Sequence, residues 1–281
     1  MAMRWSDNSV RAHRLEFRDG TFRPVWTTVV EPPANLLSLG IIGGGFDNFH
    51  QGDATAFVYL DVDSSGVAYV VVPSTADVLP AHDAFFGEHL LDGADPAHFD
   101  FGVAIVTRLA PDGARSDAVL SGLGTNRRLL AVRASARTLW LTGRIRTGSG
   151  PGSWDGWIQS FDTSTGQAIA DVGIDIQAGD MFWDLAPLDD GSVIAVGSTN
   201  YTQNPSGLSV SDARDDLAVI VGPGGDVRRR VSLPAGPTGR GNEVTSVRIV
   251  AGWAMFAGVK NAPGTHAAVF SDAFLSLRAL E

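Results

Sequence analysis

The sequence contains no cysteine and few charged residues. Of its 281 residues, 19% are charged and none is cysteine. The lack of cysteine excludes disulfides, thiolate nucleophiles and zinc sites built on cysteine, and it leaves the compartment open because reducing and oxidising environments both permit it. The net charge of −10 and the pI of about 4.9 mean that a phosphate backbone is repelled on average, so we expect no nucleic-acid partner.

Long apolar runs are also missing. No run approaches the ~18 residues that a membrane-spanning helix needs, so no membrane segment is expected. The first ten residues are polar and lack the apolar core of a signal peptide. The localisation therefore stays open: extracellular or periplasmic if a secretion signal lies upstream of Met1, and cytoplasmic otherwise.

Familiar catalytic and phosphate-binding motifs are absent as well. The chain has no GxSxG elbow, no P-loop, no GxGxxG between a strand and a helix, and no HExxH. The glycine-rich stretch LGIIGGGF at 39–46 is followed by no helical pattern that could receive a phosphate, so it is interpreted as a bent loop. No motif therefore names an activity, and the architecture carries most of the information.

What the sequence does contain is glycine, short apolar runs and a recurring segment. With 33 glycines, 14 prolines and 44% hydrophobic residues, it suits many short strands joined by tight turns. The segment DDGSVIAVGST at 189–199 is a turn, a strand, and then a glycine where the strand would continue. Its relatives lie at 66–75, 137–147, 190–199 and 252–262, preceded by strand-like runs at 56–62, 129–134, 181–188 and 244–250. Each pair predicts a β-hairpin.

A second kind of hairpin lies between the first ones. It is predicted at 101–120, 156–172 and 216–233, with turns at Asp112-Gly113, Thr165-Gly166 and Gly224-Gly225. Glycine supplies the positive φ that a tight hairpin turn needs. Residues 266–281 look like a weaker fourth copy and residues 10–29 like a fifth.

The spacing of the recurring glycine predicts the fold class. Gly143 and Gly197 are 197 − 143 = 54 residues apart, and Gly197 and Gly258 are 258 − 197 = 61 apart. Four antiparallel strands at this period predict an all-β protein, a β-propeller whose blades bury their faces on one another, in preference to a β-sandwich or a β-helix. We count four complete blades plus an N-terminal hairpin, which predicts one domain over 1–281, either five-bladed or an N-terminally truncated part of a larger ring.

These segments resemble the blades of bacterial β-propeller repeat proteins. That family carries a DG-x-apolar-x-apolar-x-G-x-T segment, matched best by residues 190–199, followed by an aspartate that opens the next strand, matched by Asp100, Asp155 and Asp216. The resemblance runs from about residue 56 onward and departs from the pattern at Pro73 and His266. It implies the propeller fold. It implies no activity, because members of the family share none.

Residues that recur in every blade are expected to build blades. Asp100, Asp155 and Asp216 are therefore interpreted as acceptors for turn amides. The basic run 228–230 lies on a predicted outermost strand, where charge discourages pairing between molecules. The stretch DVDSSG at 61–66 imitates the start of a calcium loop but lacks its closing carboxylate.

Two long insertions depart from the repeat. Propeller topology places the insertions 30–55 and 76–99 on the same face, and loops of this length often carry function. Their histidines and carboxylates suggest a divalent metal, with His82, Asp83, Glu88 and His89 as the candidate ligands. The alternatives are a solvated loop without a cofactor and a short amphipathic helix that caps the face.

Aromatic residues form the other non-repeating feature. Trp154, Trp183 and Tyr201 are predicted to lie toward the same face, beside Asp180, Asp184 and Asn200. A ring that stacks on a sugar while polar groups bind its hydroxyls would make a glycan site of Trp154, Trp183, Tyr201 and Asp180. The alternative is packing between neighbouring blades.

The function predicted from these features is a non-catalytic binding or scaffold module. Its partner would be a protein or a glycan bound on the loop-bearing face. The alternative is a metal-dependent propeller hydrolase, lactonase-like or glycan-cleaving, in which the insertion residues polarise a water molecule.

Overall fold

The computed structural model describes residues 2–4, 10–31, 59–74, 103–121, 127–135, 137–147, 154–177, 179–199, 215–231, 233, 243–260 and 272–279. Within these ranges the regular elements are all β-strands. They are β1 (Ala2–Arg4), β2 (Val10–Arg18), β3 (Thr21–Glu31), β4 (Tyr59–Val62), β5 (Ala68–Ser74), β6 (Val103–Leu109), β7 (Arg115–Ser121), β8 (Arg127–Ala134), β9 (Thr138–Arg146), β10 (Trp154–Asp162), β11 (Ala168–Ile174), β12 (Met181–Pro187), β13 (Val193–Thr199), β14 (Asp215–Val221), β15 (Val227–Arg230), β16 (Glu243–Val250), β17 (Trp253–Lys260) and β18 (Asp272–Ala279).

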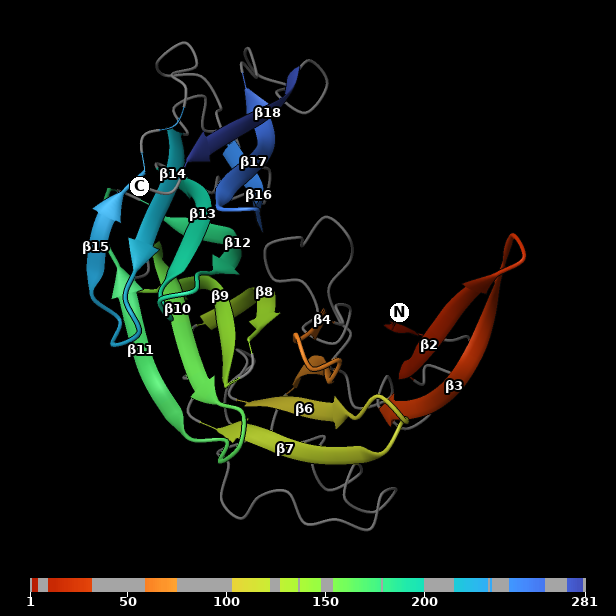
Figure 1. Ribbon diagram of the computed structural model, residues 1–281. Coiled ribbons are helices and arrows are strands. Elements are labelled where there is room, and N and C mark those ends of the chain that lie inside the picture. The colour runs from red at the N-terminus through yellow and green to blue at the C-terminus, as the bar shows by residue number, and fades with distance from the viewer. Residues whose placement is uncertain are drawn as a thin grey trace, which may run out of the picture. The chain divides into compact units, whose positions relative to one another are not determined.

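The strands form antiparallel sheets in which neighbours in sequence are neighbours in space (Figure 1). Three sheets have four strands, in the orders β4-β5-β6-β7, β11-β10-β9-β8 and β12-β13-β14-β15. Two have three strands, β1-β2-β3 and β16-β17-β18. The predicted all-β class with four-stranded antiparallel sheets of the propeller-blade type is confirmed.

The two ends of the chain differ in detail from the predicted hairpins. The hairpin expected at 266–281 is wrong, because residues 272–279 form the single strand β18, which pairs along its length with β17. At the other end, the hairpin predicted at 10–29 is present as β2 and β3, and the short strand β1 pairs with β2 in addition.

The chain divides into two compact units. Unit 1 comprises Met1–Arg127, Ala134–Arg137 and Ser164–Gly166, and unit 2 comprises Arg128–Arg133, Thr138–Thr163 and Gln167–Glu281. Each unit is described by itself below. The single propeller domain over 1–281 stays a prediction.

In unit 1, the β2–β3 hairpin docks on the sheet β4–β7. Trp26 Nε1 donates to the Pro111 carbonyl at 3.1 Å, beside the β6–β7 turn. The Trp26 ring lies so close to Gly113 that a Cβ there would meet it at 3.0 Å, and the φ of +90° also favours glycine. A small core of Ala12, Val30, Ala68, Val70 and Leu109 lies between the two sheets. The predicted Asp-Gly turn is therefore also a packing surface.

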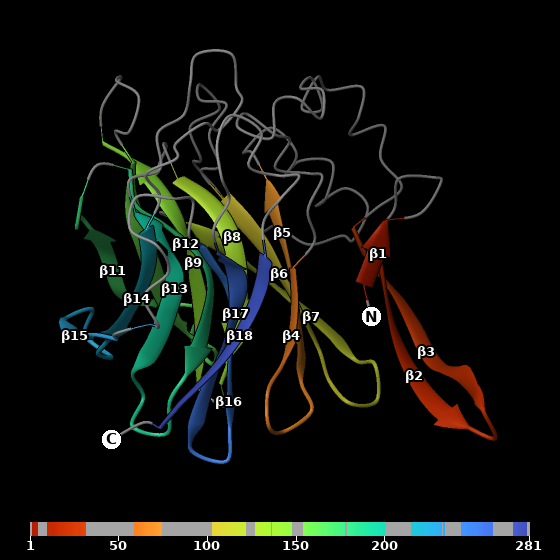
Figure 2. The same ribbon diagram turned by 90° about the horizontal axis from the view of Figure 1, so that it is seen from above.

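In unit 2, the sheet β12–β15 is buried on both faces. Side chains alternate along β13: Val193 and Ala195 pack toward Trp140 and Ile158 of the sheet β8–β11, whereas Ile194 and Val196 join the core formed with the sheet β16–β18. All seven residues of β13 are buried, and the strand lies between β12 and β14 (Figure 2). This confirms the expectation that neighbouring sheets bury one another's faces.

The glycine that recurs in the sequence has a steric explanation. A Cβ at Gly197 would lie 1.8 Å from the carbonyl oxygen of Met181, and one at Gly258 would lie 2.0 Å from that of Glu243. In both hairpins the partner strand is bulged: the register shifts between Phe182 and Asp184 in β12, and between Val244 and Ser246 in β16. A bulge pushes the backbone of one strand against the other, and only glycine leaves room for it.

The predicted edge strand is confirmed at β15. It is the outermost strand of its sheet, and its four residues are exposed. Arg228 reaches the carboxylates of Asp190 at 2.9 Å and Asp226 at 3.3 Å. Exposed charge on a short edge strand is the usual protection against pairing between molecules.

Candidate functional site

Several predicted site residues lie outside the described residues. These are the insertion 76–99, residues 32–55 of the first insertion, the candidate metal ligands His82, Asp83, Glu88 and His89, and Tyr201. In the described part of the chain, no group of three or more histidine, aspartate or glutamate side chains is arranged to hold a metal ion. The predicted metal site therefore stays a prediction.

The carboxylates of the stretch at 61–66, which imitates the start of a calcium loop, accept hydrogen bonds from the protein itself. Asp63 Oδ1 accepts the amides of Ser65 and Val67 and the Ser65 hydroxyl, at 2.6–3.1 Å, and Oδ2 accepts the Tyr69 hydroxyl at 3.1 Å. Burial alone raises the pKa of Asp63, but these hydrogen bonds outweigh it and hold the pKa below its usual value. Asp61 accepts the Ala134 amide at 2.7 Å. Both carboxylates thus serve the fold, as turn and strand acceptors.

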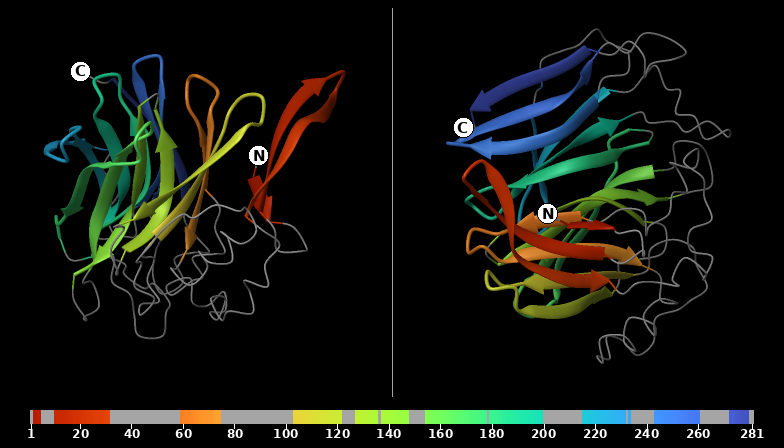
Figure 3. Two further views of the ribbon diagram at one scale, coloured as in Figure 1. Left: turned by 90° about the horizontal axis from the view of Figure 1, so that it is seen from below. Right: turned by 90° about the vertical axis from the view of Figure 1, so that its right-hand side faces the viewer.

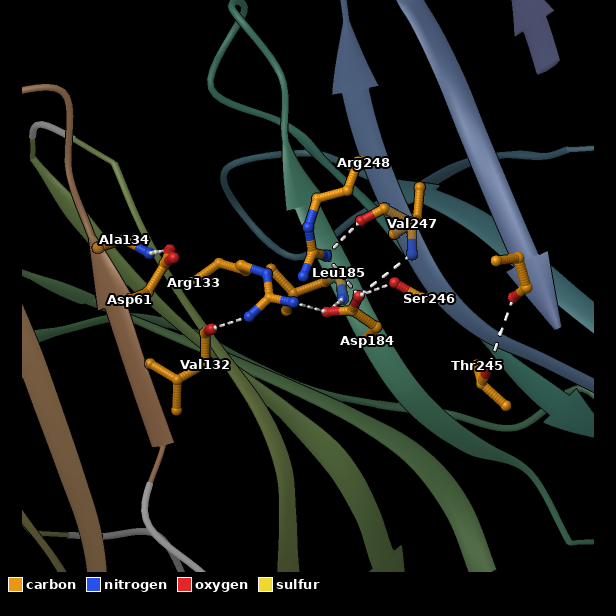
Figure 4. Close-up of polar contacts among 11 residues, drawn as sticks. Asp61, Val132, Arg133, Ala134, Asp184, Leu185, Thr245, Ser246, Val247 and Arg248 are labelled. Atoms are coloured by element: carbon orange, nitrogen blue, oxygen red, sulfur yellow. Dashed lines mark hydrogen bonds and ion pairs between the residues drawn. The ribbon is translucent and has the colours of Figure 1, made fainter. Parts of the chain in front are cut away.

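In unit 2, the Asp184 carboxylate accepts hydrogen bonds from residues of three strands, β8, β12 and β16 (Figure 4). Its side chain is only 5% exposed. Oδ1 accepts Arg133 Nη2 from β8 at 2.5 Å and the Leu185 amide at 2.9 Å. One carboxylate oxygen therefore links β12 to the neighbouring sheet.

The other oxygen links β12 to the third sheet. Asp184 Oδ2 accepts three hydrogen bonds from β16: the Ser246 hydroxyl at 3.1 Å, the Val247 amide at 3.1 Å and Arg248 Nη1 at 2.7 Å. Asp184 was expected beside the aromatic residues of a glycan site, and the structure shows its carboxylate occupied by hydrogen bonds from the protein itself. Asp184 is a structural acceptor that ties three sheets together.

Asp180 lies four residues earlier, at the opposite end of β12 from the Asp190-Gly191 turn. In unit 2 the β12–β13 and β16–β17 turns lie at one end of the strands (Figure 3), and Asp180 precedes β12 at the other. Its Oδ2 accepts the amides of Ile176 at 2.5 Å and Gln177 at 3.0 Å. The residue is completely buried, and Oδ1 has no hydrogen-bond partner among the described residues. One acceptor of a buried carboxylate is therefore left open.

Trp154 adjoins Asp180 through the backbone. The Asp180 amide donates to the Trp154 carbonyl at 2.7 Å, which joins the start of β12 to the start of β10. The Trp154 ring is partly buried, and the Arg144 guanidinium lies 4.0 Å from its centroid. Arg144 itself is 2% exposed. This cation–π contact fixes the ring orientation.

Two more carboxylates belong to this end of unit 2. Burial raises the pKa of Asp155, with Asp175 and Asp180 adding to the rise, while the Thr147 hydroxyl opposes it. Burial likewise raises the pKa of Asp180; the nearby Thr199 hydroxyl and the amides of Ile176 and Gln177 oppose the rise, and Asp175 adds to it. The charge of Asp175 therefore acts on both Asp155 and Asp180, and the charge of Asp180 also acts on Asp155. We call Asp155, Asp175 and Asp180, together with Trp154 and Arg144, the β10–β12 site.

The turn-amide role predicted for the recurring aspartates is not what Asp155 does. Its carboxylate accepts the Thr147 hydroxyl at 3.4 Å. Strand register also realigns the repeat: Asp155 pairs with Ile145, Asp215 with Thr199 and Asp272 with Lys260, each two residues beyond the recurring glycine. The equivalent residue in β14 is therefore Asp215, whereas the sequence comparison chose Asp216.

Trp183 lies in the bulged part of β12. It is the residue that the β12 bulge leaves unpaired, and it is partly buried. Its Nε1 is buried and has no hydrogen-bond partner in the described structure. Among the members of the predicted set that the structure describes, Trp154 and Asp180 are brought together by a backbone hydrogen bond. Arg144, Asp175 and Gln177 were missed, because nothing in their local sequence marks them.

Comparisons with known proteins add no assignment. The chain matches no model of a known protein family, and none of the curated proteins matches it either. In the described residues, no helix has the length and hydropathy to cross a membrane.

Proposed function

We propose that the chain is a non-catalytic binding module and that the β10–β12 site is one of its binding surfaces. The observation that carries the proposal is the partly exposed Trp154 ring, which the Arg144 guanidinium contacts and which is followed by the partly exposed Asp155. Ligand sites commonly combine aromatic side chains with a few polar groups that fix the orientation of the ligand.

The chemistry of the site favours a glycan as the ligand. A hydroxyl can donate to the partly exposed Asp155 carboxylate, and the apolar face of a sugar ring can pack on Trp154, whose orientation Arg144 fixes. A protein partner is the broader alternative, since the same aromatic and carboxylate groups could receive a side chain. Neither requires a chemical step.

A glycan array with three proteins tests the proposal. Wild type is expected to bind at least one glycan class, and Trp154→Ala to lose about tenfold or more in affinity for it. The matched control is Trp253→Ala, which removes an indole that is 49% exposed on β17 of the same unit. This control is expected to keep the wild-type profile. Identical profiles for all three proteins, or no binding by wild type, would overturn the proposal.

A further inference from the structure

Two guanidinium groups share the single carboxylate of Asp184 (Figure 4). Arg133 donates to Oδ1 at 2.5 Å, and Arg248 donates to Oδ2 at 2.7 Å. These three side chains have a formal balance of +2 − 1 = +1, in a chain whose net charge is −10. Arg133 has the less exposed side chain of the two arginines and is enough to balance Asp184, so the charge of Arg248 exceeds what the carboxylate needs.

The protein contacts only one nitrogen of the Arg248 guanidinium. Nη1 donates to Asp184 Oδ2 and to the Val247 carbonyl at 2.6 Å, and none of the described residues accepts a hydrogen bond from Nε or Nη2. Half of the side chain is exposed, so a dissolved ligand can reach it. Nε–H and the neighbouring Nη2–H are parallel donors of the kind with which a guanidinium binds a carboxylate in a bidentate manner.

Strand geometry places this guanidinium at the margin of a sheet. β16 is an outermost strand of its sheet, and Val247 is buried in the core shared with the sheet β12–β15. Because successive residues of a strand point to opposite faces, Arg248 leaves β16 on the face turned away from that core and reaches Asp184 past the free edge of the strand. The contacts of Nη1 hold the guanidinium there, which lowers the entropic cost of binding a ligand.

We propose that Arg248 binds the carboxylate of a small anionic ligand through Nε and Nη2. One carboxylate carries −1 and balances the +1 of the group formed by Arg133, Asp184 and Arg248, whereas a phosphate monoester carries about −2 at neutral pH and leaves the group negative. Arg248 lies near the β16–β17 turn, at the opposite end of the strands from the β10–β12 site (Figure 3). The inference therefore does not depend on the proposed function.

NMR spectra that resolve the arginine Nε–H signals of the full chain test the inference. Sodium acetate is titrated against sodium chloride at equal ionic strength, so that screening is the same in both. The Arg248 signal, identified by its loss in Arg248→Lys, is expected to shift saturably with acetate alone. The net charge of −10 opposes any anion, so the expected Kd is only about 1–10 mM.

Two results of these titrations would overturn the inference. One is an Arg248 signal that does not saturate with acetate, or that responds equally to chloride. The other concerns methyl phosphate as a third probe, which is expected to bind more weakly than acetate. Tighter binding of methyl phosphate would show that the site does not select a carboxylate.

Two lysine variants separate the paired donors from charge alone. Arg248→Lys keeps the positive charge but has no pair of parallel donors, so acetate binding, followed at the Ser246 amide, is expected to weaken about fivefold or more. The matched control is Arg228→Lys on β15, because Arg228 is 42% exposed and contacts two carboxylates, those of Asp190 and Asp226. This control is expected to keep the wild-type affinity. Acetate binding that survives Arg248→Lys, or that falls equally in both variants, would overturn the inference.

Discussion

Asp180 and Asp184 are both buried at the beginning of the same hairpin, yet their carboxylates have different surroundings. Asp184 accepts five hydrogen bonds, from three strands, and both of its oxygens are occupied. Asp180 accepts two amides on one oxygen and keeps the other open. Burial alone therefore does not identify a functional aspartate. The completeness of its hydrogen bonding separates an acceptor that joins three sheets from one that is left with an unsatisfied oxygen.

The largest effect is expected from removing the Asp184 carboxylate, both of whose oxygens accept hydrogen bonds. Asp184→Ala should lower the free energy of unfolding by about 3–5 kcal/mol, because it takes away the shared acceptor of two guanidinium groups and the Val247 amide. Urea denaturation of purified protein measures the change, with Asp189→Ala, an exposed aspartate in a turn, as the control. A loss under about 1 kcal/mol would contradict the structural role.

The two arginines refine this prediction and keep it measurable if Asp184→Ala does not fold. The Arg133 side chain is 17% exposed and that of Arg248 is 50% exposed. Arg133→Ala is therefore expected to cost about 2 kcal/mol, and Arg248→Ala under about 1 kcal/mol, since exposed ion pairs contribute little. If Arg248→Ala proves the costlier change, the burial argument is wrong.

The next largest effect is expected at Gly197, on the strand paired with β12. Gly197→Ala should cost about 3 kcal/mol or more, because its Cβ would overlap the Met181 carbonyl oxygen at 1.8 Å, and backbone must move to relieve this. The matched control is Gly173→Ala on β11, where the nearest atom to a new Cβ is an Ile145 methyl group at 3.7 Å. Chemical denaturation of both variants measures the difference. Equal stability would mean that the recurring glycine has another cause.

The smallest effect is expected from changing Asp180, whose Oδ1 has no hydrogen-bond partner among the described residues, and this effect depends on pH. Burial raises the pKa of Asp180 above its usual value of 3.8, so in the acidic range above 3.8 the folded protein holds a proton that the unfolded chain has released. Stability from this group is present below the unfolded pKa and declines as the pH rises through the folded pKa. Asp180→Asn should therefore show a smaller decline in melting temperature over this range than wild type.

Thermal unfolding of the two proteins between about pH 4 and pH 7 checks this expectation. Asp189→Asn provides the control for loss of an exposed charge. A melting temperature of Asp180→Asn that runs parallel to wild type at every pH would mean that the open oxygen carries no electrostatic penalty, and the contrast with Asp184 would then lose its basis.

Much of the fold could be predicted from the sequence because local signals are strong in it. Turn dipeptides such as Asp112-Gly113 and short apolar runs located most hairpins to within a few residues. The last strand was missed because β18 has no turn signal of its own and is defined by its pairing with β17. Periodicity also identified the recurring glycine, although not its cause, since the bulge opposite it leaves no mark in β13.

The candidate site was predictable only in part. Trp154 and Asp180 departed from the repeat, and the structure joins them through a backbone hydrogen bond. The network at Asp184 could not be predicted, because its partners lie 51 to 64 residues away and meet it only when whole sheets stack. Whether both oxygens of a buried carboxylate find hydrogen-bond donors depends on such distant residues. The residues next to the aspartate in the sequence do not reveal it.

The bulge in β12 also makes the two halves of the strand independent of each other. Phe182 and Leu185 are three residues apart, which in a regular strand would send them to opposite faces, yet both contribute to the core shared with the sheet β8–β11. The extra residue resets the alternation between them. A substitution before Trp183 can therefore alter the start of the strand, while the alternation beyond Trp183, and with it the junction of three sheets at Asp184, stays the same.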